Sequence, residues 1–166
     1  MSARGRFRGA SSRELPLVRQ SWGNDCGPAA LATVAAYHGC PFDYDDFSNE
    51  VALDRHGTNL LALSRIAERL GFRAQGIKAS YDAIPNCTLP AIAHMRGRVG
   101  GGHFVVVHRW TATHVVLADP AVGLRKLSRR AFRRRSTGYL LIIQPAPMPR
   151  SPTIDEVVTA SGRCDT

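Results

Sequence analysis

Four side chains in this sequence have types and positions that together suit nucleophilic attack on a carbonyl group. They are Gln20, Cys26, His103 and Asp119. A cysteine attacks only as its thiolate, and both a helix N-terminus and a neighbouring imidazolium favour that form. Cys26 comes directly before an apolar run typical of a helix, and Gly27 is expected to leave the approach to the sulfur open. A cysteine before a helix is more commonly inert, so the other three residues decide the interpretation.

The second pair of residues lies at the ends of two expected strands. His103 begins a β-type segment directly after a run of three glycines, and Asp119 ends the next such segment. A hairpin of these two segments brings the two positions close together. A carboxylate there can accept the Nδ1–H of the imidazole and hold its orientation. Taken singly, a histidine at a strand end is usually solvated and Asp-Pro is a common strand terminator.

Residues beside this set complete an expected cleft. Gln20 lies six residues before Cys26, and its amide can stabilise the oxyanion formed on attack, together with the Cys26 backbone N–H. Trp22, Gly27 and Gly102 are candidates for contact with the substrate. For Trp22, the residue type slightly favours a place in the core over a wall of the cleft.

Metal and cofactor chemistry is not indicated. The four cysteines, at positions 26, 40, 87 and 164, contain no C-x-x-C pair and no cluster at zinc-ligand spacing. His103 and His108 are five positions apart and so are expected on opposite faces of a strand. His94 has no evident partner in the sequence. We therefore expect neither a metal site nor a cofactor.

Hydrophobic patterning predicts an α+β fold, with helices in the first half and strands in the second. Helices are expected over 26–38, from Asp43 onward, and over 58–71. Strands are expected over 72–79, 89–95, 103–110, 113–118 and 139–143, with a short helix over 128–135 that turns Phe132 inward. Along the third helix, Leu60, Leu63 and Leu70 are expected in the core. Residues 1–14 predict a disordered basic arm, 15–145 one domain, and 146–166 a Pro-rich tail.

Positive charge is concentrated in two places. The net charge is +9, yet residues 1–13 hold four arginines without an acid and residues 125–135 hold seven basic residues without an acid. A solvated face and a basic tail explain this pattern, while an acidic peptide, nucleic acid or anionic lipid headgroups are alternative partners. Aromatic residues are not interleaved with the charges, so we expect no nucleic-acid partner. With no signal peptide and no long apolar run, the chain is expected in the cytoplasm.

Taken in order along the chain, these residues resemble the C39 peptidase domain, the processing peptidase of bacteriocin and other peptide exporters. The similarity covers roughly Leu17 to Pro145. The segments that carry it are Val18–Gln20, Asp25–Leu31, Tyr37–Gly39, Gly57–Thr58, Leu70–Gly71, Leu89–Ile92, His103–Val107, Asp119–Ala121 and Gly138.

The resemblance implies a papain-like fold, in which a helical lobe carries the cysteine and an antiparallel β lobe carries the histidine and aspartate. It implies Cys26 as nucleophile, His103 as base, Asp119 as orienting acid and Gln20 as oxyanion donor. The implied substrate is a small precursor peptide cut after a double glycine, whose amphipathic leader helix docks on an apolar patch. The implied partner is a membrane ABC exporter on the same or a separate chain, at the cytoplasmic face of a bacterial inner membrane.

Two features depart from the family pattern. Ala30 stands where many members carry a second cysteine, which is not catalytic. The sequence also contains no G-x-x-x-x-G-K-[ST] loop, so a stand-alone peptidase or an excised domain is expected. Two other functions remain open: a domain that docks leaders without cutting them, and a thiol-dependent acyl transferase. The presence of all four catalytic residue types favours the peptidase.

Overall fold

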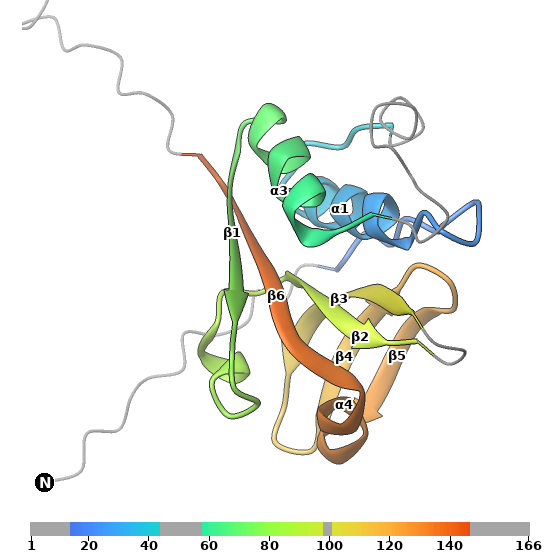
Figure 1. Ribbon diagram of the computed structural model, residues 1–166, viewed down its shortest axis with the longest axis vertical. Helices are drawn as coiled ribbons and strands as arrows, with labels where there is room; N and C mark the ends of the chain where they lie inside the picture. Colours follow the sequence, from blue (N-terminus) through green and yellow to red (C-terminus); the bar gives the residue numbers. More distant parts are fainter. Residues whose placement is uncertain (1–13, 44–57, 98–100, 147–166) are drawn as a thin grey trace, which may run out of the picture.

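The computed structural model describes residues 14–43, 58–97 and 101–146, and it shows two helices packed beside an antiparallel sheet (Figure 1). The six strands have the order β1-β6-β2-β3-β4-β5. Their bounds are β1 Phe72–Lys78, β2 Ala91–Arg96, β3 Gly102–Trp110, β4 His114–Asp119, β5 Gly123–Ser128 and β6 Ser136–Pro145. The helices are α1 Cys26–Tyr37, α3 Leu60–Arg69 and α4 Arg129–Arg135, with a 3-10 turn, η1, at Ile84–Asn86. The predicted α+β class is confirmed.

The two larger helices form for different reasons. Helix α1 is apolar on all sides and is buried from Gly27 to Ala35, as expected for a helix enclosed by other elements. Helix α3 is amphipathic: Asn59 caps it by accepting a hydrogen bond from the backbone N–H of Ala62 at 2.9 Å, and its buried side chains include Leu63. Both helices end within two residues of their predicted ends.

Two apolar cores hold the fold together. One lies between the helices and the sheet and includes Leu31, Leu63 and Val106, with Leu60 and Leu70 packed at its margin. The other includes Ile84 and Phe132 and lies among side chains from β2, β3, β4 and β6. Phe132 is fully buried, which confirms that the short basic helix turns this ring inward. The cores therefore fix α1 against β3 on one side and α4 against β4 and β5 on the other.

The structure also contains elements that the sequence patterns did not predict. Strand β5 pairs with β4 from Asp119↔Gly123 to His114↔Ser128 and forms one edge of the sheet. Gly123 permits the tight turn before it, since its φ is +114°. The η1 turn was not predicted either. The helix expected from Asp43, the basic arm and the Pro-rich tail fall on residues 44–57, 1–13 and 147–166, outside the described ranges. Among the described helices, none has the length and apolarity needed to cross a bilayer.

Candidate active site

The candidate nucleophile lies at the tip of the buried helix. Cys26 is the first residue of α1 and is half-buried. The first turn of a helix has backbone N–H groups without intrahelical partners, and the helix dipole places partial positive charge there. Helix α1 packs on β3, the strand that carries His103 near its start. The Cys26 sulfur therefore lies at the positive end of the helix dipole, at the tip of the helix that packs on the β lobe.

The imidazole and the carboxylate meet as the predicted hairpin requires, but through a different nitrogen. His103 Nε2 lies 2.8 Å from Asp119 Oδ1. The expectation that Asp119 accepts from Nδ1 is therefore wrong. Nδ1 is the ring nitrogen that remains for Cys26, whose side chain is close enough to raise the pKa of His103. Asp119 Oδ1 accepts a second hydrogen bond from the Ala121 backbone N–H at 3.1 Å. Arg125 Nη1 lies 3.6 Å from the other carboxylate oxygen.

The charges in this cluster reinforce one another. The hydrogen bonds to Asp119 and then to Cys26 raise the pKa of His103 from 6.5 to about 9, against the opposing effect of burial. Burial raises the pKa of Asp119, but the hydrogen bond and charge of His103, with Ala121 and Arg125, bring it below its ordinary value. At neutral pH the site therefore holds an imidazolium between a carboxylate and a sulfur.

Gln20 lies at the same site, because its backbone N–H donates to the Pro120 carbonyl, the residue after Asp119, at 3.1 Å. Its side-chain Nε2 donates to the Trp22 carbonyl at 2.7 Å. An amide nitrogen has two protons, so one remains for a substrate oxyanion. The structure thus brings Gln20, Cys26, His103 and Asp119 together.

Asp25 is a positioning residue that the sequence interpretation missed. It is 1% exposed, and its carboxylate accepts hydrogen bonds from the backbone N–H groups of Ser21 and Trp22 at 2.9 and 3.1 Å. These bonds hold the loop between Gln20 and Cys26. An acidic residue just before a helix was the available signal, since such residues commonly accept hydrogen bonds from nearby backbone N–H groups.

We expect Asp25→Ala to lower the free energy of unfolding by about 2 kcal/mol, because the partly buried hydrogen bonds from the Ser21 and Trp22 backbone N–H groups lose their carboxylate acceptor. It should also lower peptidase activity through the displaced loop. Urea denaturation measures the first effect, with Asp82→Ala as the control, since Asp82 is an exposed acid. Equal stability of the two variants would show that the Asp25 hydrogen bonds do not hold this loop.

A second unpredicted neighbour is His94, for which the sequence showed no partner. Thr137 Oγ1 donates its only proton to the His94 carbonyl at 3.0 Å, so His94 Nδ1–H must donate back to Oγ1, also at 3.0 Å. This leaves Nε2 unprotonated, and burial, followed by the nearby charge of His103, lowers the pKa of His94. The Nε2 edge fills the space that a Cβ on Gly102 would occupy. Gly102, next to His103, therefore has to be glycine while His94 keeps this position.

Gly102→Ala should reduce kcat/KM about tenfold, because the new methyl group displaces the His94 ring beside His103 and breaks its bond to Thr137. The matched control is Gly76→Ala, on the edge strand β1, where a Cβ meets nothing within 4 Å. Steady-state kinetics with one peptide substrate distinguishes the two. If both glycines tolerate alanine equally, the His94 contact does not position the site.

Among the three candidate substrate contacts, the structure excludes one of the two places considered for Trp22 and gives Gly27 a different role. Trp22 is 73% exposed, so the slightly favoured place in the core is wrong. Gly27 is buried, and a Cβ there would collide with the Thr58 methyl group and crowd Phe104. This glycine permits close packing of α1 on β3 and does not open a path to the sulfur. Gly102 is exposed beside His103, where a substrate can reach it.

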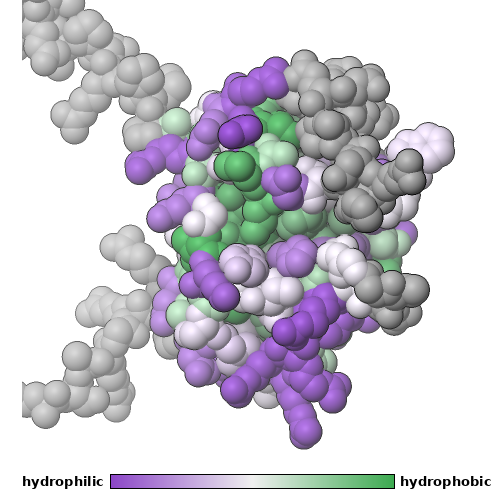
Figure 2. All heavy atoms as spheres, viewed as in Figure 1, coloured by the Kyte–Doolittle hydropathy of each residue, from purple (hydrophilic) through white to green (hydrophobic). Residues whose placement is uncertain are grey.

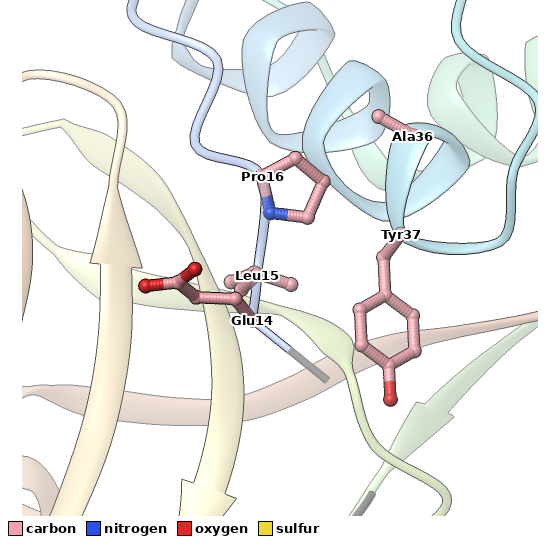
Figure 3. Close-up of a pocket in the computed structure, with 5 residues that line it drawn as sticks. All are labelled: Glu14, Leu15, Pro16, Ala36 and Tyr37. Atoms are coloured by element: carbon pink, nitrogen blue, oxygen red, sulfur yellow. The ribbon is translucent and has the colours of Figure 1, made fainter. Parts of the chain in front are cut away.

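The structure also has a cavity of about 310 Å³ at the other end of α1 from Cys26 (Figure 3). Its lining residues are Glu14, Leu15, Pro16, Ala36 and Tyr37. None of the predicted site residues is among them. It is therefore separate from the cluster around Cys26.

Comparisons with known proteins agree with this geometry. Residues 14–148 match the model of the peptidase C39 family. The transport/processing ATP-binding protein ComA of Streptococcus pneumoniae is 32% identical over 127 residues, which are 74% of this chain and 18% of that protein. The colicin V secretion/processing ATP-binding protein CvaB of Escherichia coli is 30% identical over 86% of this chain and 20% of that protein. The chain thus spans about a fifth of the length of these relatives.

Solved structures match almost over their full length. A double glycine motif protease from an AMS/PCAT transporter, in complex with its leader peptide, has a TM-score of 0.76 at 28% identity, covering 84% of this chain and 96% of that one. The peptidase domain of Streptococcus ComA has a TM-score of 0.72 at 29% identity, covering 80% and 99%. The arrangement of helices and sheet is thus the papain-like fold expected from the resemblance. With its family match, its fold and its cysteine–histidine–aspartate cluster, this chain belongs to the peptidase C39 family of cysteine peptidases.

Proposed function

We propose that the chain is an endopeptidase that cleaves the leader from a small secreted, bacteriocin-like precursor after a double-glycine-type motif. The observation that carries this proposal is the His103 imidazole, which is hydrogen-bonded to Asp119 and has its pKa raised to about 9 by Asp119 and then by Cys26. The substrate class is taken from the relatives, which are named as a transport/processing protein and a colicin V secretion/processing protein. A structural relative is a double glycine motif protease.

The reaction proceeds in two steps. The Cys26 thiolate attacks the carbonyl carbon of the second glycine, while the Cys26 N–H and the free Gln20 amide proton hold the oxyanion. The His103 imidazolium donates its proton to the leaving amine, which leaves a thioester on Cys26. Water then attacks the thioester as neutral His103 accepts its proton. The leader leaves with a free carboxylate and the sulfur is restored. Throughout, Asp119 holds His103 Nε2 and stabilises its charged form.

Two exposed apolar side chains are candidate walls of the substrate cleft. Trp22 follows Gln20, and Val122, 60% exposed, belongs to the loop between β4 and β5. The two segments are joined, since Pro120 and Ala121 carbonyls accept hydrogen bonds from Gln20 and Arg19 at 3.1 Å each. Bulky walls near the scissile bond exclude large side chains, so selectivity for glycine follows from steric exclusion.

The leader helix is proposed to dock away from the cysteine, along α3. Leu61 on this helix is 61% exposed, and Leu60 and Leu70 are half-buried. Figure 2 shows apolar surface in the band between α3 and the sheet. An amphipathic leader can lay its apolar face there and supply binding energy remote from the scissile bond. A substrate cut back to the residues around the glycines is then expected to be a poor one.

The test is incubation with leader peptides that carry Gly-Gly, Gly-Ala or bulky pairs, with products identified by mass spectrometry. We expect cutting after the small pairs only, at a rate that falls when the leader helix is removed. Binding of the leader with no cutting supports a docking domain instead. A new amide in place of a free carboxylate supports an acyl transferase.

We also propose that the peptidase works beside a peptide exporter in the bacterial cytoplasm, on the same or a separate chain. The support is that the relatives combine transport and processing in one protein. Cells that carry a precursor and an exporter are expected to release mature peptide with the active chain and none with its Cys26→Ala variant.

A further inference from the structure

A dense cluster of positive charge lies at the end of the β-sheet away from α1. We call it the basic face. Its members are Lys126, Arg129, Arg130, Arg133, Arg134 and Arg135, with no acid between them. They belong to β5, the edge strand, and to α4, whose N-cap Ser128 accepts from the Ala131 N–H at 3.2 Å. In Figure 2 a group of strongly hydrophilic side chains projects outward at the end of the molecule where α4 lies in Figure 1.

This charge is largely uncompensated. Arg125, which precedes these residues, lies 3.6 Å from the Asp119 carboxylate and so belongs to the candidate active site. Within ranges 14–43, 58–97 and 101–146, none of the six residues of the basic face has an acid within ion-pair distance. Like charges at this density raise the free energy of the free protein, and an anionic partner relieves that repulsion. The basic face is therefore suited to bind an anionic partner.

The cluster is held rigidly by contacts to uncharged groups. The Arg129 guanidinium lies over the rings of Trp110 and Tyr81, 5.4 and 5.9 Å from their centroids, and Arg133 lies 5.4 Å from that of Tyr81. Cation–π contacts keep the charge of each arginine while fixing its position. The same contacts cover ring faces that a single-stranded nucleic acid would use for base stacking. The basic face thus lacks the stacking surface typical of nucleic-acid binding.

We propose that the basic face binds the surface of an anionic lipid bilayer. Clusters of four to eight basic residues bind such surfaces by electrostatic attraction alone, without a groove or specific pocket. Phe132, the one large apolar side chain of α4, is fully buried, so α4 offers no apolar anchor and its attraction to such a surface depends strongly on salt. Helix α4 contacts β4 and β5, so a bilayer there leaves the cleft at the start of α1 open. This inference goes beyond the proposed peptidase function and stands on charge and position.

The test is sedimentation with vesicles of phosphatidylcholine alone or with about one third phosphatidylglycerol. The test variant combines Lys126→Gln, Arg130→Gln and Arg134→Gln, three exposed side chains. The control combines Arg73→Gln, Lys78→Gln and Arg109→Gln, which are also exposed and remove the same net charge from other faces. The full chain is used throughout, so the basic N-terminal arm is common to all three proteins.

We expect the native chain and the control to bind anionic vesicles at low salt, and neither to bind neutral vesicles. The test variant should bind roughly 100-fold more weakly, because each basic side chain at an anionic surface contributes about a fivefold factor. Equal losses in both variants, or equal binding of the native chain to neutral vesicles, would overturn the proposal.

A second assay, without vesicles, distinguishes binding of a bilayer from binding of an acidic leader peptide. If the basic face binds acidic leader peptides, the test variant alone shows a raised KM for leader cleavage, and the bilayer proposal is wrong. We expect unchanged leader cleavage in both variants. Absence of cleavage in all three proteins, with the vesicle results intact, would instead count against the proposed peptidase function.

Discussion

Replacing Cys26 with alanine is expected to remove peptide cleavage almost entirely, lowering kcat by at least about 10⁴-fold. The loss arises because no other group in the cluster can form the thioester, and the oxyanion donors alone give only weak catalysis. The fold should persist, since the buried body of α1 begins at Gly27. Kinetics with a double-glycine leader peptide and a thermal melt together measure the two effects.

Two other cysteines supply the control. Cys40 is exposed and Cys87 is half-buried, and both are free thiols. Cys40→Ala and Cys87→Ala should leave cleavage within about twofold of the native rate, since neither belongs to the site. Full activity in the Cys26→Ala variant would refute the nucleophile assignment, whatever the structure of the site. Mass spectrometry after brief iodoacetamide treatment should find Cys26 modified first, because it alone of these three cysteines lies at a helix start beside His103.

Asp119→Asn is expected to lower kcat by roughly 10²–10⁴-fold and to move the basic limb of the pH profile to lower pH. The hydrogen bond to Asp119 is the largest cause of the raised His103 pKa of about 9. An asparagine amide carries no charge, so the imidazolium loses its main stabilisation and deprotonates nearer its ordinary 6.5. The measurement is kcat/KM against pH for both proteins. Asp82→Asn, at an exposed acid, should reproduce the native profile, and an identical profile in Asp119→Asn contradicts the account.

The raised pKa of His103 also makes the free energy of unfolding depend on pH. The folded pKa of His103 is raised above its ordinary value of 6.5. Its contribution to the free energy of unfolding is therefore fully present below about pH 6.5 and is lost as the pH rises through about 9. In Asp119→Asn the pH range over which this contribution is lost should narrow, because the folded pKa of His103 falls towards its unfolded pKa. Denaturation midpoints across this pH range record the change.

The elements with a strong local pattern could be predicted from the sequence. Helix α1 has an unbroken apolar run that ends at Gly39, and β3 has a continuous apolar centre; both begin within one residue of the expected position. Strand β5 could not be predicted in this way. Its residues alternate between exposed and partly buried positions within an arginine-rich stretch, and its strand conformation depends on pairing with β4 across the Gly123 turn. Such pairing is a long-range property that a local pattern does not contain.

In the site, too, some features could be predicted from the sequence and others could not. The hairpin argument brought His103 and Asp119 together correctly, because strand ends are fixed by pairing register. The nitrogen that meets Asp119 was wrong, since ring orientation is set by the distance from α1 to β3 and not by sequence order. His94 and Asp25 were missed for a related reason. His94 lies against the Gly102 backbone, and Asp25 accepts from the Ser21 and Trp22 N–H groups. These backbone groups come close to the two side chains only in the folded chain.

The central claim is that one imidazole is shared between a buried carboxylate and a sulfur at a helix tip. An NMR pH titration of the His103 ring tests it most directly, because it reports the proton on that ring without requiring any substrate. We predict a midpoint near pH 9 in the native chain, with a clear downward shift in Asp119→Asn and a smaller one in Cys26→Ala. A native midpoint near the ordinary 6.5, unchanged by both substitutions, would contradict the account.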